Sequence, residues 1–275
     1  TIIDTIKYLR AGFNNISGND AIYALYEFKA LTLSALYTQY AAYNIQNSFI
    51  FSSTDLIYLT GSRYRLFEKN ESDESKLVFL RALMTLPGIP TYIHGDELGY
   101  HKTSISRDGL FPVMNWTDEA PLYGFSTNPD TQNIDESQPT VPNNNILKGF
   151  KQLVKLRRLN RAFTLSKAFM MTSDNDVLIF QVQKTDRTYI CAHNFSDKGK
   201  SIRICNEKVN NNPEVNFFEF ITMANTTIPI DDGEYYLFDL LNNITMDILT
   251  VENGVYEYNT TLSRYGSLVA KLIKV

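Results

Sequence analysis

Two polar side chains, Thr54 and Asp55, come directly after the short run NSFIFSS at residues 47–53. The apolar centre of this run and its small polar end predict a buried strand that delivers Asp55 to its carboxyl-terminal edge. A carboxylate at such an edge could contact a bound substrate. It can equally cap a turn or bind water.

A second polar cluster follows the apolar run at residues 89–93. It comprises His94, Asp96 and Glu97 in the turn sequence HGDELG. These side chains could carry chemistry, but a tight turn of this kind also serves simply to support a fold. The histidines of the chain lack the spacing of metal ligands and no Gly-rich phosphate loop occurs, so neither a metal nor a nucleotide cofactor is predicted.

The elements that would position these side chains alternate between helix and strand. Residues 20–44 and 73–86 carry apolar side chains at three- and four-residue spacing, which predicts helices before and after the run at 47–53. Alternation of this kind predicts parallel strands, whose carboxyl-terminal edge is the functional face of α/β barrels. Residues 100–145 are rich in Pro, Asn, Asp, Thr and Ser, which predicts a loop over that rim.

The pattern changes to short strands after a third predicted helix that ends near Arg161. Apolar runs separated by turn residues predict an antiparallel β-sandwich domain. These runs are 177–184, 187–195, 200–205, 215–222, 234–240, 244–251 and 266–275. We therefore predict part of a (β/α)8 barrel over residues 1–162, with its rim loop, and an antiparallel β-domain over residues 163–275.

The predicted barrel part contains only two or three parallel strands. Such a sheet would leave strand edges unpaired and one face of each helix uncovered. We expect the remaining strands to come from an upstream half of the same protein or from a second chain.

Two cysteines lie in neighbouring predicted strands. A three-residue turn, with Gly199 in the left-handed position, would place Cys191 opposite Cys205. A cross-strand disulfide would fit an oxidising compartment, whereas two buried thiols would fit a reducing one.

Longer motifs connect these observations to a known family. The segment LMTLPGIPTYIHGDELG, from Leu83, resembles the eighth-strand signature of the α-amylase superfamily of glycoside hydrolases. The segment SRDGLFPVMNWTDEAPLYGFSTNPD, from Ser106, is similar to a region of animal α-glucosidases. The resemblance implies the C-terminal part of a TIM barrel followed by a β-domain. The branch that it resembles includes animal α-glucosidases and the heavy subunits of heteromeric amino-acid transporters.

Active members of that superfamily use three carboxylates, and the resemblance places only the third in this chain, at Asp55. The nucleophile and the general acid, which retaining chemistry needs about 5 Å apart, would lie upstream. Thr54 stands where the family has a sugar-binding His, and Phe111 stands where it has a rim Arg. A subsite that holds its ligand by several simultaneous hydrogen bonds is weakened when such donors are lost.

The resemblance therefore implies a catalytically degenerate ectodomain, similar to a transporter heavy subunit, that acts by protein–protein association with a membrane transporter light subunit. Two other functions stay open. An active α-glucosidase or α-amylase-type hydrolase would keep its nucleophile and acid upstream and use Asp55. A cell-surface receptor would use the same scaffold to bind a ligand.

Composition and charge restrict partners and location. The net charge of −4 is spread along 275 residues, which argues against nucleic acid as a partner. No apolar run is long enough to span a membrane, so we expect any anchor to lie outside this chain. An excess of Asn-x-Ser/Thr acceptors favours the extracellular side of a membrane or the secretory pathway. Asn70, Asn225 and Asn259 should be exposed to glycosylation, whereas Asn115 should be buried beside Trp116, a predicted packing anchor.

Overall fold

The structure, a computed structural model, describes part of the chain between Phe67 and Val275. The described residues are 67, 69–86, 90, 92, 94–101, 113–120, 134–165, 167–171, 176–184, 187–206 and 230–275. Several predicted features lie outside them: Thr54, Asp55, Phe111, Asn225, the helix at 20–44 and the strands at 47–53 and 215–222.

Helix α5 spans Asp73–Thr85 and confirms the second predicted helix. The hydroxyl of Ser72 accepts a hydrogen bond from the backbone N–H of Ser75 at 3.1 Å, which caps the first turn. Leu86 adopts an extended conformation, because a residue that precedes proline, here Pro87, is disfavoured in the helical region.

Helix α6 spans Asn145–Leu159 and confirms the third predicted helix. The side chain of Asn144 accepts a hydrogen bond from the N–H of Leu147 at 2.7 Å and caps its start. The apolar face of α6 packs against α5. A short helix, α7 at Ala162–Leu165, follows and contacts the second strand of the β-domain.

Eight strands occur within the described residues, and six of them match predicted runs. Their bounds are β1 Lys167–Met170, β2 Val177–Lys184, β3 Arg187–Asn194, β4 Lys200–Cys205, β5 Gly233–Asp239, β6 Ile244–Val251, β7 Glu257–Leu262 and β8 Ser267–Lys274. They form a six-stranded sheet in the order β1-β2-β3-β8-β5-β6 and a two-stranded sheet, β4-β7. Every pairing is antiparallel, as predicted, while β1 and β7 were not predicted.

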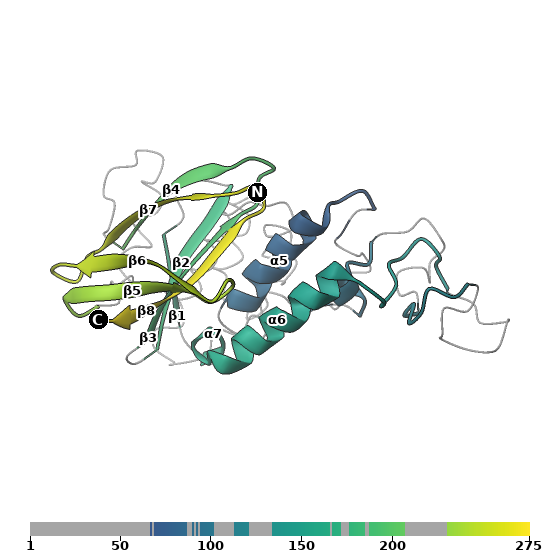
Figure 1. The fold of residues 1–275 in the computed structure, drawn as a ribbon, viewed down its shortest axis with the longest axis horizontal. Coiled ribbons are helices and arrows are strands. Elements are labelled where there is room, and N and C mark those ends of the chain that lie inside the picture. The colour runs from purple at the N-terminus through teal and green to yellow at the C-terminus, as the bar shows by residue number, and fades with distance from the viewer. Residues whose placement is uncertain are drawn as a thin grey trace, which may run out of the picture.

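The central strands of the large sheet are buried on both faces. In β2, Leu178 and Phe180 belong to the core that contains α5 and α6, whereas Val177 and Ile179 belong to a second core beneath β4 and β7. Figure 1 shows the helices on one side of the sheet and β4 and β7 on the other. Burial on both faces explains why these strands read as nearly continuous apolar runs.

The predicted hairpin between the two cysteine strands is wrong. Cys191 in β3 lies opposite Phe180 and Val269, whereas Cys205 in β4 lies opposite Glu257 in the other sheet. The residues are thiols and do not form a disulfide. Strand β3 already pairs with β2 on one edge and β8 on the other, so β4 can only join a different layer.

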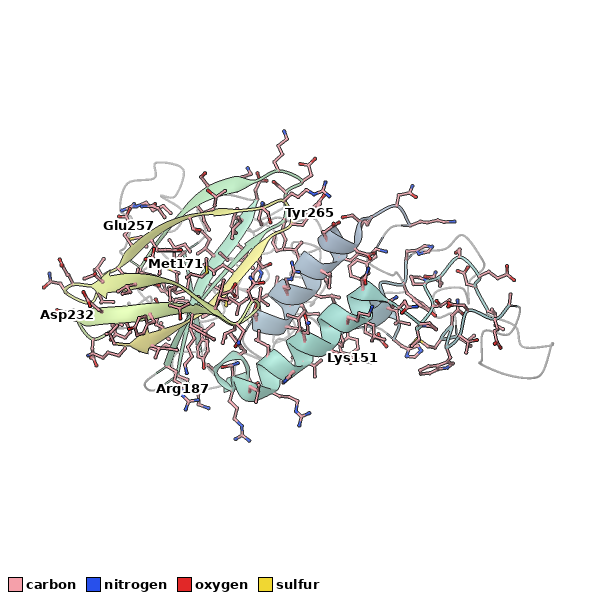
Figure 2. All side chains as sticks on the ribbon, viewed as in Figure 1. Lys151, Met171, Arg187, Asp232, Glu257 and Tyr265 are labelled. Carbon is pink, nitrogen blue, oxygen red and sulfur yellow. The ribbon has the colours of Figure 1, made fainter. Side chains whose placement is uncertain are left out.

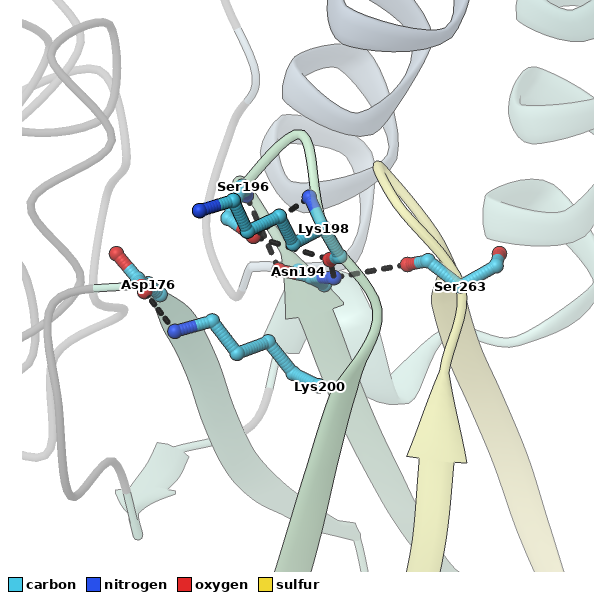
Figure 3. Close-up of polar contacts among 6 residues, drawn as sticks. All are labelled: Asp176, Asn194, Ser196, Lys198, Lys200 and Ser263. Atoms are coloured by element: carbon cyan, nitrogen blue, oxygen red, sulfur yellow. Dashed lines mark hydrogen bonds and ion pairs between the residues drawn. The ribbon is translucent and has the colours of Figure 1, made fainter.

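The loop between β3 and β4, which connects the large sheet to the two-stranded sheet, is held by hydrogen bonds of the Asn194 side chain. The side-chain amide of Asn194 donates to the carbonyl oxygens of Lys198 at 2.7 Å and Ser263 at 2.8 Å. Its oxygen accepts from the N–H of Ser196 at 3.0 Å, as Figure 3 shows. Gly199 does not have the positive φ that the predicted hairpin required. After β3 the chain therefore turns through a loop organised by Asn194, and not through a tight turn at Gly199.

Little of the predicted barrel can be traced in the described residues. Phe67 and His101 form an isolated parallel bridge, and neither Pro90 nor Tyr92, in the run predicted as a strand, lies in one. The helical core nevertheless continues into the β-domain without a break. The position 162/163, where a change of domain is predicted, lies inside α7, and the first strand begins at Lys167.

Candidate functional site

The described residues in and next to the predicted rim loop form a hydrogen-bonded turn, and two loop segments lie against this turn. The turn is His94–His101, and the segments are 113–120 and 134–144. The predicted site residues Asp55, Thr54 and Phe111 lie outside the described residues, so their roles remain predictions.

Two glycines with left-handed backbone conformation enclose the signature turn. Gly95 and Gly99 have φ of 98° and 77°, on either side of the 3₁₀ helix η2 at Asp96–Leu98. A side chain at Gly95 would place its Cβ 2.6 Å from the ring of Tyr100, a distance that real side chains essentially never show. The sequence GDELG is thus fixed by backbone geometry as well as by packing.

Of the two acidic residues in this turn, Glu97 holds the turn itself. A carboxylate oxygen of Glu97 accepts a hydrogen bond from the N–H of Gly95 at 2.8 Å. This contact favours the interpretation that the turn serves to support the fold. The neighbouring His94 is exposed and Asp96 is buried.

A buried lysine from α5 secures the other end of the turn. The ammonium group of Lys76 donates to the carbonyl oxygen of Gly99 at 3.0 Å and lies 5.8 Å from the ring centre of Phe67. Burial lowers the pKa of Lys76, although nearby acidic residues act in the opposite direction. The helix pattern at residues 73–86 does not distinguish Lys76, because no local motif marks a lysine that binds a distant carbonyl.

A polar network joins His101 to the 134–144 segment. The N–H of His101 donates to the side-chain oxygen of Gln138 at 2.9 Å, and the Gln138 amide donates back to the His101 carbonyl at 2.9 Å. Asp135 accepts hydrogen bonds from Ser137 Oγ at 2.7 Å and from Gln138 at 3.1 Å. Burial alone would raise the pKa of Asp135, but these hydrogen bonds outweigh it and lower that pKa.

Asn115 is buried at the centre of the rim segments, as predicted. Its N–H donates to the hydroxyl of Tyr100 at 2.8 Å, and its side-chain amide donates to the carbonyl oxygens of Asp135 and Gln138. Its neighbour Trp116 is 51% exposed, so the prediction that Trp116 anchors this loop by packing is wrong. Tyr100 provides the buried ring at this position instead.

The third histidine, His193, is structural. One ring nitrogen lies 2.9 Å from Thr85 Oγ1 and the other lies 3.0 Å from Ser267 Oγ, so both are hydrogen-bonded inside the core. Burial, with a smaller contribution from Arg81, lowers the pKa of His193 to about 3. Among the described residues, no group of three His, Cys, Asp or Glu side chains is placed to hold a metal ion.

The glycosylation acceptors differ in accessibility. Asn70 and Asn259 are exposed, as predicted, although Asn259 lies in strand β7 and not in a turn. Asn115 and Asn194 are fully buried. No helix in the described ranges has the length and apolarity needed to cross a bilayer.

Comparisons with known proteins point to one superfamily. No known family profile matches the chain. It is 26% identical over 124 residues to the amino acid transporter heavy chain SLC3A2 of Mus musculus, covering 44% of this chain and 23% of that protein. It is 26% identical over 156 residues to alpha-amylase 3 of Dictyoglomus thermophilum, covering 53% of this chain and 30% of that protein.

A solved structure shares the fold. The α-amylase from H. orenii superposes with a TM-score of 0.59 at 14% identity, over 97% of this chain and 50% of that one. The chain therefore spans about half the length of that enzyme, and its matches cover less than a third of either curated relative.

Proposed function

Because the chain resembles the C-terminal part of α-amylase-superfamily proteins, we propose that it is a catalytically degenerate member of that group, acting by protein–protein association. The observation that carries the proposal is the replacement of two sugar-binding positions, by Thr54 and Phe111. The similarity to an amino acid transporter heavy chain supports a role as a heavy subunit that binds a membrane transporter light subunit. The same similarity supports a position on the extracellular side of a membrane.

The described rim residues support this proposal from a second direction. Glu97 holds the backbone of its own turn, and Asp135 is surrounded by donors from Ser137 and Gln138. The hydrogen bonds to Asp135 favour its ionised form and lower its pKa, so Asp135 is a poor general acid near neutral pH. Both carboxylates therefore serve the scaffold, which leaves Asp55 as the remnant to test.

The competing function is an active α-amylase-type hydrolase. It is favoured by Asp55 itself and by the match to alpha-amylase 3, which covers a larger share of this chain than the transporter match does. In that case Asp55 would contact sugar hydroxyls near the transition state, and its loss would reduce turnover strongly.

One assay separates the two functions. Protein purified in the longest form that its source produces would be tested on maltose and p-nitrophenyl α-glucoside. We expect no turnover by the wild type, the Asp55→Asn variant or the control variant Glu119→Gln, which changes an exposed carboxylate. Turnover that is lost in Asp55→Asn and kept in Glu119→Gln would establish the hydrolase and contradict the proposal.

Association would be tested separately. Chemical crosslinking on intact cells from the native source should capture a multi-span membrane protein together with this chain. Capture of no membrane protein, together with quantitative recovery of the chain in a soluble monomeric form, would contradict the heavy-subunit role.

A further inference from the structure

A groove lies between helices α5 and α6 and the turn at residues 240–243 that joins β5 to β6. It has a volume of about 580 Å³, which falls in the range that small-molecule sites occupy. Figure 1 shows α5 and α6 side by side, with the β5–β6 turn reaching toward them. The residues that line the groove come from these three parts of the chain and from Asn160, which follows α6.

Leucine side chains from all three parts give the groove an apolar surface. They are Leu77 of α5, Leu153 and Leu156 of α6, and Leu240 and Leu241 of the turn. Leu153 and Leu156 belong to the helical core, whereas the other three pack against that core and stay partly accessible. No residue in the lining is aromatic, so the groove suits a flexible aliphatic chain better than a ring that needs a stacking partner.

Arg81 supplies a half-buried cation to this apolar groove. A guanidinium carries five N–H donors. One of those on Arg81, at Nη1, donates to the carbonyl oxygen of Tyr265 at 3.3 Å. None of the ion pairs found in the described part of the chain includes Arg81. Most of its donors are therefore available to a ligand.

The carboxylate that acts on Arg81 is Asp239, which is 2% exposed and does not line the groove. Its oxygens accept hydrogen bonds from the N–H of Leu241 at 2.9 Å and from the side-chain amide of Asn242 at 2.6 Å. Burial lowers the pKa of Arg81, and the charge of Asp239 acts in the opposite direction. Asp239 thus favours the charged form of Arg81 while its own oxygens hold the turn.

The rim of the groove is polar and carries no negative charge. Gln152 and Lys155 are exposed on α6, and Asn243 is exposed on the turn. None of the residues that line the groove, all of which the structure describes, is acidic. A ligand with an anionic head and an apolar body would therefore meet favourable charge at the rim and leucine side chains beneath it.

We propose that this groove binds an aliphatic carboxylic acid, with its carboxylate on Arg81 and its hydrocarbon chain on the leucine side chains. A guanidinium presents paired N–H donors that match the two oxygens of a carboxylate, and such charge-assisted hydrogen bonds fix the head group. Lys155 adds a second positive charge at the rim. Each methylene group that the groove buries should tighten binding by roughly fourfold.

Calorimetric titrations with octanoate, heptanoate, 1-octanol and acetate separate the head group from the chain, and would use protein purified in the longest form that its source produces. We expect saturable binding of octanoate, roughly fourfold weaker binding of heptanoate, and at least tenfold weaker binding of 1-octanol and of acetate. Equal affinity for octanoate and 1-octanol would show that the carboxylate is not recognised and would overturn the proposal. Absence of saturable octanoate binding would overturn it as well.

Two kinds of variant test the cations. Arg81→Gln should weaken octanoate binding at least tenfold and leave 1-octanol binding within twofold, which would show that the groove itself is intact. Lys155→Gln and Lys151→Gln both change an exposed lysine of α6, but only Lys155 lines the groove. Figure 2 shows Lys151 on the side of α6 that faces away from α5. We expect twofold to fivefold weakening in Lys155→Gln and none in Lys151→Gln, whereas equal weakening would show a diffuse charge effect and overturn the proposal.

A third variant keeps the test decisive if Arg81→Gln fails to fold. Gln152 is exposed and makes no hydrogen bond within the part of the chain that the structure describes, so Gln152→Trp adds a ring to the groove without removing a contact. Its circular dichroism should match wild type. Octanoate should raise the melting temperature of the wild type and of the control Lys151→Trp, but not that of Gln152→Trp. Unchanged octanoate affinity in Gln152→Trp would place the binding elsewhere and overturn the proposal.

Discussion

The imidazole of His193 and the hydroxyl of Thr85 lie 2.9 Å apart and connect helix α5 to strand β3 inside the core. Burial lowers the pKa of His193 to about 3 from a model-peptide value of 6.5. The unfolded chain therefore binds a proton between these values that the folded chain does not. Stability should consequently fall as the pH falls from about 6.5, by up to about 1.4 kcal/mol per pH unit.

Urea unfolding at pH 7, 6 and 5 tests this coupling. The wild type should lose stability progressively over that range, whereas His193→Gln, which starts less stable, should show a clearly smaller slope. Equal slopes in the two proteins would show that His193 does not titrate on unfolding in this range.

Replacing Lys76 by methionine should destabilise the protein by about 1–3 kcal/mol, because the buried carbonyl of Gly99 would lose its donor. The control Lys148→Met, on the exposed side of α6, should change stability by less than about 0.5 kcal/mol. Both are measured by urea unfolding. Equal, small effects in the two variants would mean that the Lys76 contact contributes nothing net.

Replacing Gly95 by alanine should cost about 1–3 kcal/mol or more, because its φ of 98° is strained for alanine and the new methyl group would meet the ring of Tyr100. Gly199→Ala is the matched control. Its φ is not positive, and a Cβ there would make only an ordinary 3.5 Å contact with the carbonyl oxygen of Leu262. Thermal unfolding that ranks the two variants in the reverse order would contradict this assignment.

Alkylation should separate the two cysteines. Burial raises the pKa of the Cys191 thiol strongly, opposed only by a hydrogen bond with Thr85. Cys205, half-buried in the two-stranded sheet, should therefore react with iodoacetamide first under native conditions. Denaturation without reductant should then yield two alkylated cysteines. A mass that shows a retained disulfide would contradict the strand pairing.

Glycan mapping tests the predicted location. Enzymatic deglycosylation in heavy-oxygen water should label Asn70 or Asn259 in protein from its native source, and neither Asn115 nor Asn194, since both are fully buried. Label at a buried acceptor would contradict the packing described above. No label at Asn70, Asn259 or Asn225 would argue against an extracellular position.

The strands of the β-domain could be predicted where both of their faces are buried, because such strands read as nearly continuous apolar runs. Strand β7, EYNTTL, escaped prediction since it lies in the outer two-stranded layer and its burial is confined to alternate or terminal positions. The order of strands could not be predicted either. The short loop after Asn194 resembles a hairpin turn in sequence, but the partners of β3 come from β2 and from β8 at the far end of the chain.

The position of the rim could be predicted from the sequence, but the hydrogen bonds that connect its segments could not. Local sequence indicated a structured turn at GDELG. The burial of Asn115 was predicted from its place beside Trp116 in the rim motif, although Trp116 itself is exposed. The pairing of His101 with Gln138 spans 37 residues and has no local signature.

Arg157 has a further consequence through its three carbonyl partners, which lie at the end of α5 and in α7 and so tie α5, α6 and α7 together. The core that these helices share with the large sheet then makes helices and sheet one mechanical unit. A single backbone cleavage between α7 and β1 would therefore leave two fragments in one particle. They should migrate together in native gels and separate only in denaturant.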